Sequence, residues 1–499
     1  MSYKMNLSDL NRDGDVSITQ QLVDRFVAAI ESGELPPGEK LPPTRRLAEE
    51  AGVNHLTAAR VYRKLAELGY VSASVGRGTF VRTLAPASSV ELGDDWQVYT
   101  LPEQDVGFPE EVLADAFTVD EPDMISLAQG WPSPQTYPVD ELARLTSDVF
   151  TEEGVNALSY LPPEGLYKLR EQIAKRGRRI GYATEPEEIV VTSGAQQALQ
   201  LAGASALEPG DVAVVESPSF IGMIGALRAA GARVIGMPVD ERGFDVDGLE
   251  RLLARHEVKV VALQTASHNP TGGDLAPDRA LRLAELAQER NFFLFEDQVY
   301  ADIRFGSERP RSLRELAPGH VVHVNSFSKV LGPGLRVGWI AARGPIMERI
   351  AMSKLVADFH TSTVTQHIAA RWLASGAHDR HVKKTMPFYR ERRDALIDAL
   401  ERHLDGEYRA QVPTGGHHVW VTLNRPLDER ALYSEAARHG LTFTPGAAVT
   451  PERRSQTGLR LSFPLLDPDE LDEGVRRLAR AMREVRRRSR HSVAAGPIS

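Results

Sequence analysis

Apolar and polar residues follow two different patterns along this chain, and the first 83 residues show the helical one. In three successive segments apolar residues recur three or four positions apart, as on one face of a helix, and glycine or proline follows each segment. The pattern predicts helices at Ile18–Ser32, Thr44–Ala51 and from the N-cap Asn54 to Leu68, then short strands at Tyr70–Val71 and Thr79–Val81. Thr44 is expected to cap the second helix, and Ala58, Val61, Leu65 and Leu68 are expected to face the core.

From Ile125 onward, short apolar runs alternate with helical segments. The strand candidates are Ile189–Thr192, Val212–Glu216, Arg233–Pro238, Lys259–Gln264, Phe292–Glu296, Val321–Val324 and Val337–Ala341. Helical segments such as Ala195–Ala206 and Pro277–Arg290 separate several of them. Strands that are apolar throughout are typical of a mostly parallel sheet with both faces covered, so we expect an α/β domain.

Residues 84–124 separate the two patterns and have no sustained period, apart from a possible helix at Pro109–Phe117. We therefore predict three parts: a helical domain at residues 1–83, a linker at 84–124 and an α/β domain at 125–499. Charge follows the same division, because residues 40–82 carry eight Lys or Arg against three Glu, whereas residues 84–125 carry eleven acidic residues and no basic one. The net charge of −9 is therefore unevenly distributed. The first domain is basic, which favours binding to nucleic acid, and the linker is acidic.

The composition narrows the class of protein. With 42% hydrophobic and 25% charged residues, the 499-residue chain is expected to fold rather than to be disordered. The absence of cysteine excludes disulfide scaffolds, thiol nucleophiles and thiolate zinc sites, and no metal site is predicted. The first residues lack the apolar core of a signal peptide, and no run of about 18 apolar residues is present to span a membrane. We therefore expect a cytoplasmic protein.

The third predicted helix has the features of a recognition helix. Such a helix places its N-terminal side chains at base edges in the major groove, while the preceding helix contacts the backbone. Thr44 and Arg45 begin the second helix, where phosphates bind well. Glycines on both sides of Arg77 allow a sharp turn that offers this arginine to DNA. The predicted DNA-binding residues are Thr44, Arg45, Asn54, His55, Thr57, Arg60 and Arg77.

This region resembles the GntR-type winged helix-turn-helix over nearly its whole length. The resemblance rests on Ile30–Gly38, Leu41–Ala48 and Gly76–Val81. It implies binding to a double-stranded DNA operator. The family usually has Ser-Arg before the recognition-helix threonine, where this chain has Asn54-His55, so the preferred base sequence is left open. The alternative is a degenerate module kept for dimerisation.

A lysine at the end of a predicted strand suggests covalent chemistry in the α/β domain. Lys329 follows Val324-Asn325-Ser326-Phe327-Ser328 and precedes a glycine-rich segment that contains Arg336. An amine at a strand end, beside small hydroxyl groups and an arginine, suits a Schiff base to an aldehyde cofactor that also carries a phosphate. Ser326, Ser328 and Arg336 are expected to bind that phosphate.

Other polar segments follow predicted strands in the same way. Asp297 ends one strand and is placed to keep a pyridine nitrogen protonated, and Tyr300 comes three residues later, within reach of a ring hydroxyl. Asn269 follows another strand and offers an amide to the same oxygen. Ser193-Gly194-Ala195-Gln196 lies at a strand-to-helix junction, where free N–H groups bind phosphate, and Phe220 is placed to stack on the ring. Because the carboxyl ends of parallel strands meet at one edge, we expect these residues to gather there.

Residues from about 125 to 480 resemble a fold-type I aminotransferase of the aspartate aminotransferase family. The motifs occur in that family's order, namely Tyr160 with Pro163-Glu164-Gly165, Ser193-Gly194-Ala195-Gln196, Asn269-Pro270-Thr271-Gly272, Asp297 with Tyr300, Ser326 to Lys329, Arg336 and Gly415-Gly416. The resemblance implies a pyridoxal 5'-phosphate-binding domain with a smaller C-terminal α/β subdomain. The expected fold is therefore a winged helix-turn-helix joined to an α/β domain of this type.

The resemblance also implies roles for individual residues. Lys329 forms the internal aldimine, and Asp297 pairs with the pyridine nitrogen. Asn269 and Tyr300 bind the ring oxygen, and Phe220 takes the stacking position.

Two further matches concern partners of the protein. Tyr160 matches the tyrosine that reaches the phosphate of the neighbouring subunit, which implies a homodimer. Arg460 matches the arginine that binds a substrate α-carboxylate, a role that suits a bidentate guanidinium. The whole chain resembles the MocR family of bacterial regulators. That resemblance implies a transcription regulator that senses pyridoxal phosphate, or a small amino compound through an external aldimine.

Two alternatives remain open from the sequence. His268-Asn269 and Asp297-Gln298-Val299-Tyr300 are closer to working aminotransferases than to many such regulators, so one alternative is an active aminotransferase with a DNA-binding appendage. The other is a binding protein without cofactor chemistry, which replacement of Lys329 by Ala would leave unchanged. The sequence leaves open the effector, the operator, and whether the protein activates or represses.

Overall fold

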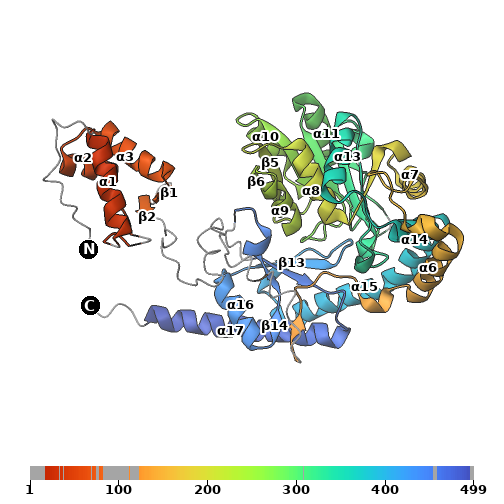
Figure 1. Cartoon of the computed structure of the whole chain (residues 1–499). Coiled ribbons are helices and arrows are strands. Elements are labelled where there is room, and N and C mark those ends of the chain that lie inside the picture. The colour runs from red at the N-terminus through yellow and green to blue at the C-terminus, as the bar shows by residue number, and fades with distance from the viewer. Residues whose placement is uncertain are drawn as a thin grey trace. The chain divides into compact units, whose positions relative to one another are not determined.

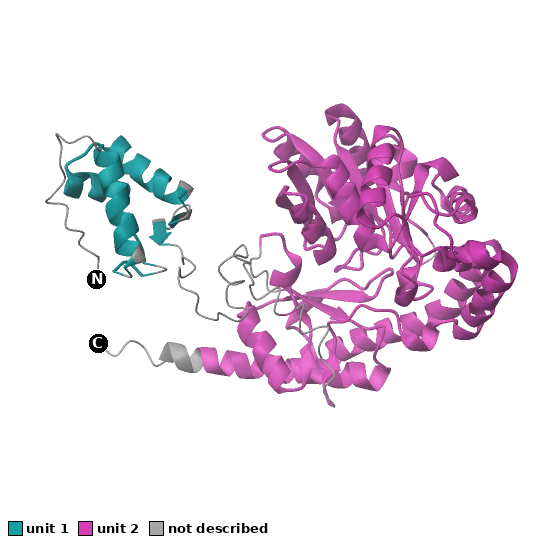
Figure 2. Ribbon diagram, in the orientation of Figure 1, with its two compact units in different colours: residues 1–105 teal, residues 106–499 magenta. Residues whose placement is uncertain are grey.

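The computed structural model describes residues 17–32, 34–36, 39–68, 70–74, 78–81, 112, 123–306, 308–452 and 458–494. These residues form two compact units, residues 1–105 and residues 106–499 (Figure 2), and each is considered by itself. Arg77 lies outside the described residues, as does the predicted helix Pro109–Phe117 except for Val112. The predicted domain limits near residues 83 and 125 therefore stay predictions.

The first unit is a three-helix core with a two-stranded wing. Its elements are α1 (Ile18–Glu31), α2 (Thr44–Ala51), α3 (His55–Glu67), β1 (Val71–Ser74) and β2 (Gly78–Val81). The two strands are antiparallel, with Val71 opposite Val81. Phe26 and Tyr62 meet edge to face in the core at 5.9 Å between ring centroids, and the Tyr62 hydroxyl donates to the Pro42 carbonyl at 2.6 Å. All three predicted helices and both strands are confirmed.

Two local predictions in this unit are wrong. Thr44 is the first helical residue of α2 rather than its cap, because Pro43 occupies the N-cap position and no side chain caps that end. Leu68 does not face the core, because α3 ends at Glu67 and the leucine side chain is 52% exposed. The prediction for Asn54 is confirmed, since its side chain accepts a hydrogen bond from the Thr57 N–H at 2.7 Å.

The second unit contains an eight-stranded sheet in the order β4-β11-β10-β9-β8-β5-β6-β7 (Figure 1). Its strands are β4 (Ile189–Thr192), β5 (Val212–Ser217), β6 (Arg233–Asp240), β7 (Gly243–Phe244), β8 (Val258–Leu263), β9 (Phe293–Asp297), β10 (Val321–Ser326) and β11 (Gly338–Ala341). Strands β10, β9, β8, β5 and β6 run parallel, whereas β11 is antiparallel to both of its neighbours. The prediction of a mostly parallel sheet is confirmed.

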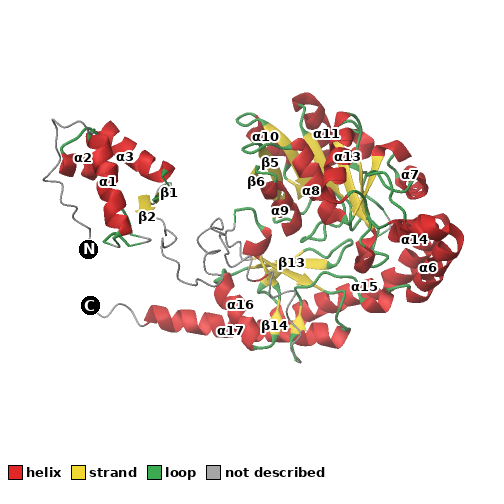
Figure 3. Cartoon of the chain, in the orientation of Figure 1, coloured by secondary structure: helices red, strands yellow, loops and turns green. Residues whose placement is uncertain are grey.

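Helices cover both faces of this sheet, as the secondary-structure colouring in Figure 3 shows. The helices are α6 (Val139–Glu153), α7 (Tyr167–Ile180), α8 (Ala195–Ala206), α9 (Ile221–Ala229), α10 (Val246–Leu253), α11 (Pro277–Arg290), α12 (Leu313–Leu316), α13 (Pro345–Asp358) and α14 (Thr363–Ala374). Adjacent strand residues face opposite sides: Val215 packs in the cluster with α8, α9 and α13, whereas Val214 packs with α10 and α11. The parallel strands are therefore apolar on both faces, as their sequences indicated.

A smaller antiparallel sheet completes the second unit. It has the order β12-β13-β16-β15 and packs with long helices on its own core. The elements of this C-terminal part of the second unit are α15 (Ala377–Leu404), β12 (Tyr408–Ala410), β13 (His418–Leu423), α16 (Glu429–Arg438), β14 (Leu441–Thr442), β15 (Thr444–Pro445), β16 (Gly458–Ser462) and α17 (Pro468–Ala494). The short strand β3 (Ile125–Ser126), which directly follows the predicted linker, pairs in parallel with β14. Among the described helices, none has the length and apolar character needed to cross a membrane.

Candidate cofactor and DNA-binding sites

Lys329 lies just beyond the end of β10, in the single turn Phe327–Lys329. Its Nζ donates to the Gly130 carbonyl at 3.1 Å and lies 5.4 Å from the centre of the Tyr300 ring. The pKa of the lysine is lowered to about 8, mainly by burial and also by the charges of Arg460 and Arg336, while Asp297 acts in the opposite direction. A larger share of this amine is therefore unprotonated near neutral pH than for an ordinary lysine, which is the form that attacks an aldehyde.

Asp297 ends β9 and is buried close to the lysine. Its carboxylate accepts hydrogen bonds from the Val299 N–H at 3.0 Å and from the Gln264 amide at 2.8 Å. The pKa of Asp297 is raised to about 6, mainly by burial and also by the nearby Glu216 carboxylate, against the effect of these hydrogen bonds. A cationic partner, such as a protonated pyridine nitrogen, would stabilise the charged carboxylate here.

The sequence analysis missed Gln264, which connects two of the predicted residues. While its side-chain Nε2 donates to Asp297, its Oε1 accepts from the Asn269 N–H at 2.7 Å. The backbone N–H of Gln264 donates to Glu216 at 3.0 Å. Gln264 and Glu216 each lie at the carboxyl end of a predicted strand, and that position is the signal that marks both.

The sequence analysis also missed two adjacent histidines, although they directly follow the quoted Gly415-Gly416. His418 Nε2 lies 3.1 Å from the Tyr300 hydroxyl, and its Nδ1 lies 2.9 Å from the Ser462 hydroxyl. His417 Nδ1 lies 3.2 Å from the Gly130 carbonyl that Lys329 also contacts. Burial lowers the pKa of His417 to about 3 and that of His418 well below its ordinary value, so both rings are neutral beside the lysine.

The predicted phosphate-binding residues gather at the start of α8. Gly194 is the N-cap of this helix with φ of +90°, and a Cβ there would lie 2.5 Å from Nη2 of Arg336. Arg336 donates to the Ser193 carbonyl at 2.8 Å. The first N–H groups of α8, at Ala195 and Gln196, have no acceptor within the helix. The glycine therefore leaves room for a guanidinium beside these N–H groups, an arrangement that suits an anion.

We call the group formed by Gly194, the first N–H groups of α8 and Arg336 the anion cradle. Ser326 and Ser328 lie on its strand side. Their hydroxyl oxygens are 2.8 Å apart, and the Ser326 hydroxyl also lies 3.0 Å from the Val337 carbonyl, to which it donates. Ser326 is buried, whereas Ser328 is half-buried. Ser328 is therefore the more accessible of the two hydroxyl groups.

Phe220 is the N-cap of α9 and is half-buried. Gln196 donates to the carbonyl of Gly222 at 3.0 Å, and a Cβ at Gly222 would lie 2.1 Å from the Gln196 side chain and 2.5 Å from the Phe220 ring. Gly222 thus allows the glutamine and the aromatic ring to lie next to each other at this end of the sheet.

Arg460 projects from β16 of the smaller sheet and is held by three acceptors. It donates to the Asn269 side chain at 3.3 Å, to the Ala128 carbonyl at 2.8 Å and to the Thr444 hydroxyl at 2.9 Å. Burial lowers its pKa to about 10, so the guanidinium remains charged at neutral pH. The tertiary structure therefore brings this arginine beside Asn269, 191 positions away in the sequence.

Tyr160 is not part of this group of residues. Its side chain is 85% exposed, and it contacts Phe359 and His360 at ring-centroid distances of 6.3 and 5.5 Å. Within one chain, therefore, Tyr160 lies on the surface rather than in the site.

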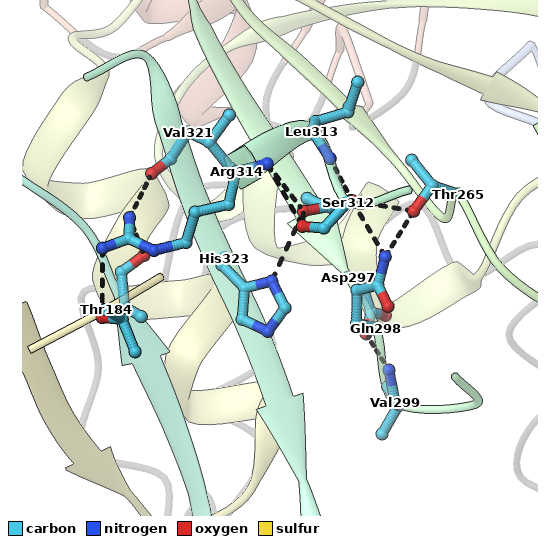
Figure 4. A network of polar contacts seen from close by, with 12 residues as sticks. Thr184, Thr265, Asp297, Gln298, Val299, Ser312, Leu313, Arg314, Val321 and His323 are labelled. Carbon is cyan, nitrogen blue, oxygen red and sulfur yellow. Dashed lines mark hydrogen bonds and ion pairs between the residues drawn. The ribbon is translucent and has the colours of Figure 1, made fainter. Parts of the chain in front are cut away.

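A second buried carboxylate, that of Glu296, directly precedes Asp297 in β9. Glu296 accepts hydrogen bonds from the Leu313 N–H at 2.8 Å and from the Ser312 hydroxyl at 2.5 Å, and His323 Nδ1 lies 3.4 Å away (Figure 4). Burial alone would raise the pKa of Glu296, but the hydrogen bonds from His323, Ser312 and Leu313 lower it to about 2. The network keeps this carboxylate charged inside the protein.

In the first unit, the predicted DNA-binding residues lie at the N-terminal ends of α2 and α3. Asn54, His55 and Arg60 are exposed at the start of α3, and Thr57 is half-buried. Arg45 is exposed in the first turn of α2, and Thr44 beside it is half-buried. Arg77 lies outside the described residues. The described side chains leave a polar, partly basic surface at the two helix starts.

The residues of the second unit fit pyridoxal 5'-phosphate. A half-buried lysine of lowered pKa, a buried carboxylate, and an anion cradle that a side chain at Gly194 would block converge at the carboxyl ends of the parallel strands. These are the partners that an aldehyde, a pyridine nitrogen and a phosphate require. Together, the fold and the site define an aminotransferase-type, pyridoxal phosphate-binding protein that carries a winged helix-turn-helix.

Comparison with known families specifies this class. Residues 122–478 match the model for "Aminotransferase class I and II", and residues 18–81 match the model for "Bacterial regulatory proteins, gntR family". The chain therefore belongs to the aminotransferase class I and II family, in the branch of MocR-like transcription regulators that also carry a gntR-family domain.

Individual relatives agree with this assignment. The uncharacterized HTH-type transcriptional regulator YisV of Bacillus subtilis is 29% identical, over 95% of this chain and 98% of that protein. The probable rhizopine catabolism regulatory protein MocR of Rhizobium meliloti is 26% identical, over 95% of each chain. Among solved structures, the multiple substrate aminotransferase of Thermococcus profundus is 32% identical with a TM-score of 0.73, covering 78% of this chain and 97% of that one. Similarity to the regulators thus extends over both units, whereas similarity to the enzyme covers the second.

Proposed function

We propose that this regulator binds an operator as a homodimer in the bacterial cytoplasm and changes its DNA binding when its second unit takes up pyridoxal phosphate or a small amino compound. The gntR-family domain supports the DNA partner. The charged groups of the second unit support the ligand class, because a lysine, a carboxylate and an arginine converge there.

The observation that carries this proposal is the position of residues 128–130. They follow β3, the first strand after the predicted linker, and their carbonyls contact the two side chains that the ligands would engage. The Ala128 carbonyl accepts from Arg460 at 2.8 Å, and the Gly130 carbonyl accepts from Lys329 at 3.1 Å. A ligand that binds Lys329 and Arg460 competes with these carbonyls, so occupancy acts directly on the chain that leads to the DNA-binding unit. A ligand changes DNA binding only if it prefers one arrangement of this segment.

We assign roles within the second unit on the contacts described above. Lys329 would hold the cofactor through its aldehyde group, and Asp297 would pair with the ring nitrogen. Asn269 and Tyr300 would bind the ring oxygen, and Phe220 would lie against the ring. Bound pyridoxal phosphate supplies an electron sink for an amino group attached to it.

Further residues bind the charged groups of the ligands. Gly194, Ala195, Gln196, Ser326, Ser328 and Arg336 hold the phosphate. Arg460 binds the carboxylate of an amino compound, and this replaces its bond to Ala128.

The homodimer explains the exposure of Tyr160. Its ring contacts Phe359, which is also exposed, and the nearby stretches of sequence carry the exposed apolar side chains Val155, Leu158 and Val356. A partner subunit that covers this face would remove apolar surface from water and would place Tyr160 near the partner's phosphate cradle.

The direct test is a DNA-binding titration of the full-length protein with its own upstream region. We expect the affinity or the footprint to change when pyridoxal phosphate is added, and to change again with an amino acid that Arg460 accepts. Lys329→Ala should abolish borohydride labelling at position 329 and both responses, whereas Arg460→Met should keep the label and lose the amino acid response. If the wild type stays colourless with pyridoxal phosphate and DNA binding is unchanged, the proposal is wrong.

Turnover measurements on the same full-length protein test the alternative that it is an active aminotransferase. The complete set of Lys329, Asp297, Asn269 and Tyr300 at one edge of the sheet is what an aminotransferase requires, which is why turnover needs to be measured. Sustained exchange of amino groups with a keto acid, together with no specific footprint, would favour the enzyme. A ligand-dependent footprint without turnover favours the regulator.

A further inference from the structure

We infer that His418 is a positioning residue for Tyr300: its ring sets the direction in which the Tyr300 hydroxyl donates its hydrogen. The inference rests on the proposed cofactor site and adds a residue from the smaller sheet to it. His418 lies at the start of β13, whereas Tyr300 follows β9 of the larger sheet, so the contact joins the two parts of the second unit.

The contacts form a chain of four groups. The Tyr300 hydroxyl lies 3.1 Å from His418 Nε2, and His418 Nδ1 lies 2.9 Å from the Ser462 hydroxyl. Ser462 in turn donates to the Ala128 carbonyl at 3.4 Å. The pairing of β13 with β16 fixes the middle of this chain, because His418 and Ser462 are directly opposite each other.

The distances allow two arrangements of the hydrogens. If Ser462 donates to Ala128, its oxygen accepts from Nδ1–H of His418, and Nε2 of the neutral ring then accepts from the Tyr300 hydroxyl. In this arrangement the only hydrogen of the Tyr300 hydroxyl points at His418 and is not available to a cofactor oxygen.

The opposite arrangement frees that hydrogen. If Ser462 donates to Nδ1, the ring carries its proton on Nε2 and donates to the Tyr300 oxygen, which leaves the tyrosine hydrogen free for the cofactor ring oxygen. Both arrangements contain the same three protons, on the serine, the histidine and the tyrosine. A hydroxyl that also accepts a hydrogen bond is a stronger donor, so His418 strengthens the bond that Tyr300 makes.

The surroundings leave His418 little freedom to move. The side chain is 2% exposed, and a Cβ at Gly130 would lie 2.1 Å from its Cε1 atom, so the glycine allows the ring to lie against the 128–130 segment. This series of hydrogen bonds ends at the Ala128 carbonyl, which also accepts a hydrogen bond from Arg460 at 2.8 Å. A carboxylate that draws Arg460 away from Ala128 therefore acts on the same acceptor as Ser462. His418 thus connects the carboxylate-binding arginine with the tyrosine.

The test measures the pH at which the absorbance band of the lysine-bound cofactor titrates. With the cofactor bound we expect the second arrangement, in which Tyr300 donates to the ring oxygen; Tyr300→Phe then removes that donor and should raise this apparent pKa by about one unit, the equivalent of one hydrogen bond. His418→Phe retains an aromatic ring without a polar atom and should raise it by about half a unit. His418→Gln, whose amide reaches the position of Nε2, should restore most of the wild-type value.

The double variant decides between positioning and a structural role. If His418 acts through Tyr300, then His418→Phe causes no further shift in a Tyr300→Phe background. An equal shift in both backgrounds, or no shift in the wild type, overturns the inference. Ser462→Ala removes the hydrogen bond to His418 without changing Tyr300. It should shift the apparent pKa of the lysine-bound cofactor in the same direction as His418→Phe.

A second measurement does not require the cofactor. In the cofactor-free protein, a double-mutant cycle on the melting temperature for Tyr300→Phe and His418→Phe should show coupling between the two positions, whereas a cycle with His418→Gln should show little. Additive changes in the first cycle would contradict the inference. If the wild type takes up no cofactor, the proposed function fails, yet this cycle still decides whether His418 holds Tyr300.

Discussion

Lys329 and Asp297 show how burial adjusts two residues for one cofactor. Burial disfavours charge on both side chains, so it lowers the pKa of the lysine to about 8 and raises that of the aspartate to about 6. Both values lie closer to neutrality than those of exposed side chains. The amine is thereby prepared to attack an aldehyde, and the carboxylate gains most from a cationic partner.

The lowered pKa of Lys329 predicts the pH dependence of cofactor capture. Only the neutral amine attacks, so the rate constant for capture by the cofactor-free protein should rise about tenfold per pH unit below about 8 and level off above it. A lysine at its ordinary pKa of about 10.4 would show a continued rise through pH 9. Stopped-flow absorbance measures the rate. Arg460→Met removes a positive neighbour and should move the midpoint upward, and an unchanged midpoint would contradict this explanation.

Glu296 predicts a pH-dependent contribution to stability. Its pKa in the folded protein is about 2, below the ordinary 4.5, so its contribution is complete above about pH 4.5 and is lost as the pH falls toward 2. Glu296→Gln should therefore lower the unfolding free energy at pH 7 by about 3 kcal/mol, and the difference should shrink on acidification.

Thermal unfolding of both proteins between pH 7 and 3 measures this difference. The matched control is Glu285→Gln on α11, an exposed carboxylate paired with Arg282 at 3.3 Å, which should change stability by less than about 0.5 kcal/mol. A deficit for Glu296→Gln that stays constant down to pH 3 would falsify the argument.

At the scale of the element, Asn54 at the start of α3 has to satisfy two requirements, one for helix stability and one for DNA binding. The Asn54 side chain caps the helix by accepting from the Thr57 N–H, and it is also exposed where a recognition helix meets DNA. Helix stability requires an oxygen acceptor at this position, whereas DNA binding excludes a negative charge. Substitution can separate the two demands.

Asn54→Asp keeps the acceptor and adds a charge. We expect the melting temperature of the first unit to stay the same or rise, because a carboxylate is favourable at a helix N-terminus. Operator affinity should fall about tenfold, equivalent to about 1.4 kcal/mol, through repulsion from DNA phosphates. Asn54→Ser is the matched neutral cap and should retain both properties. Fluorescence anisotropy at two salt concentrations measures the binding, and equal affinity of the two variants would rule out a contact at this position.

At the scale of the whole molecule, the most exposed apolar side chains of the second unit lie in the segments that contain Tyr160 and the end of α13. Val155 is 81% exposed, Leu158 74% and Val356 85%, values that are costly for a monomer in water. Tyr160 and Phe359 lie 6.3 Å apart between ring centroids, so the two segments share one face. We expect this face to be covered in the dimer.

If the proposed homodimer forms through this face, Val356→Arg should convert it into a monomer. A charge at an apolar interface remains without a partner there and opposes association. The monomer should also bind pyridoxal phosphate more weakly, since Tyr160 of the second subunit is removed from the site. Leu281→Arg on α11 replaces another exposed apolar side chain, 50% exposed, and should leave the dimer intact. Sedimentation velocity measures the mass, and a dimer that survives Val356→Arg would place the interface elsewhere.

Much of the fold follows from local sequence patterns. The bounds predicted for Ile189–Thr192, Ala195–Ala206 and Pro277–Arg290 are those of β4, α8 and α11 in the structure. These segments combine a strong hydrophobic period with clear stop signals. Where a boundary depends on a single terminal residue, as at Leu68, the pattern gave the wrong exposure, because helix ends fray within one or two positions.

Tertiary structure added the partners of the predicted side chains. Gln264 ends a predicted strand and His418 closely follows Gly415-Gly416, but only the fold shows that they contact Asp297 and Tyr300, through hydrogen bonds that span 33 and 118 positions. Tyr160 shows the reverse case, since its motif was clear but its site is not completed within one chain.

The sequence by itself determined the order of helices and strands, the two classes of domain and the lysine, carboxylate and glycine positions at strand ends. Periodicity and turn residues act over a few positions, and the carboxyl ends of parallel strands meet at one edge whatever lies between them. Only the tertiary structure decided which side chains share a hydrogen bond, which pKa values are shifted, and that residues 128–130 lie against Lys329 and Arg460. Those properties depend on burial and on distances of about 3 Å between residues far apart in the chain, and no local pattern encodes them.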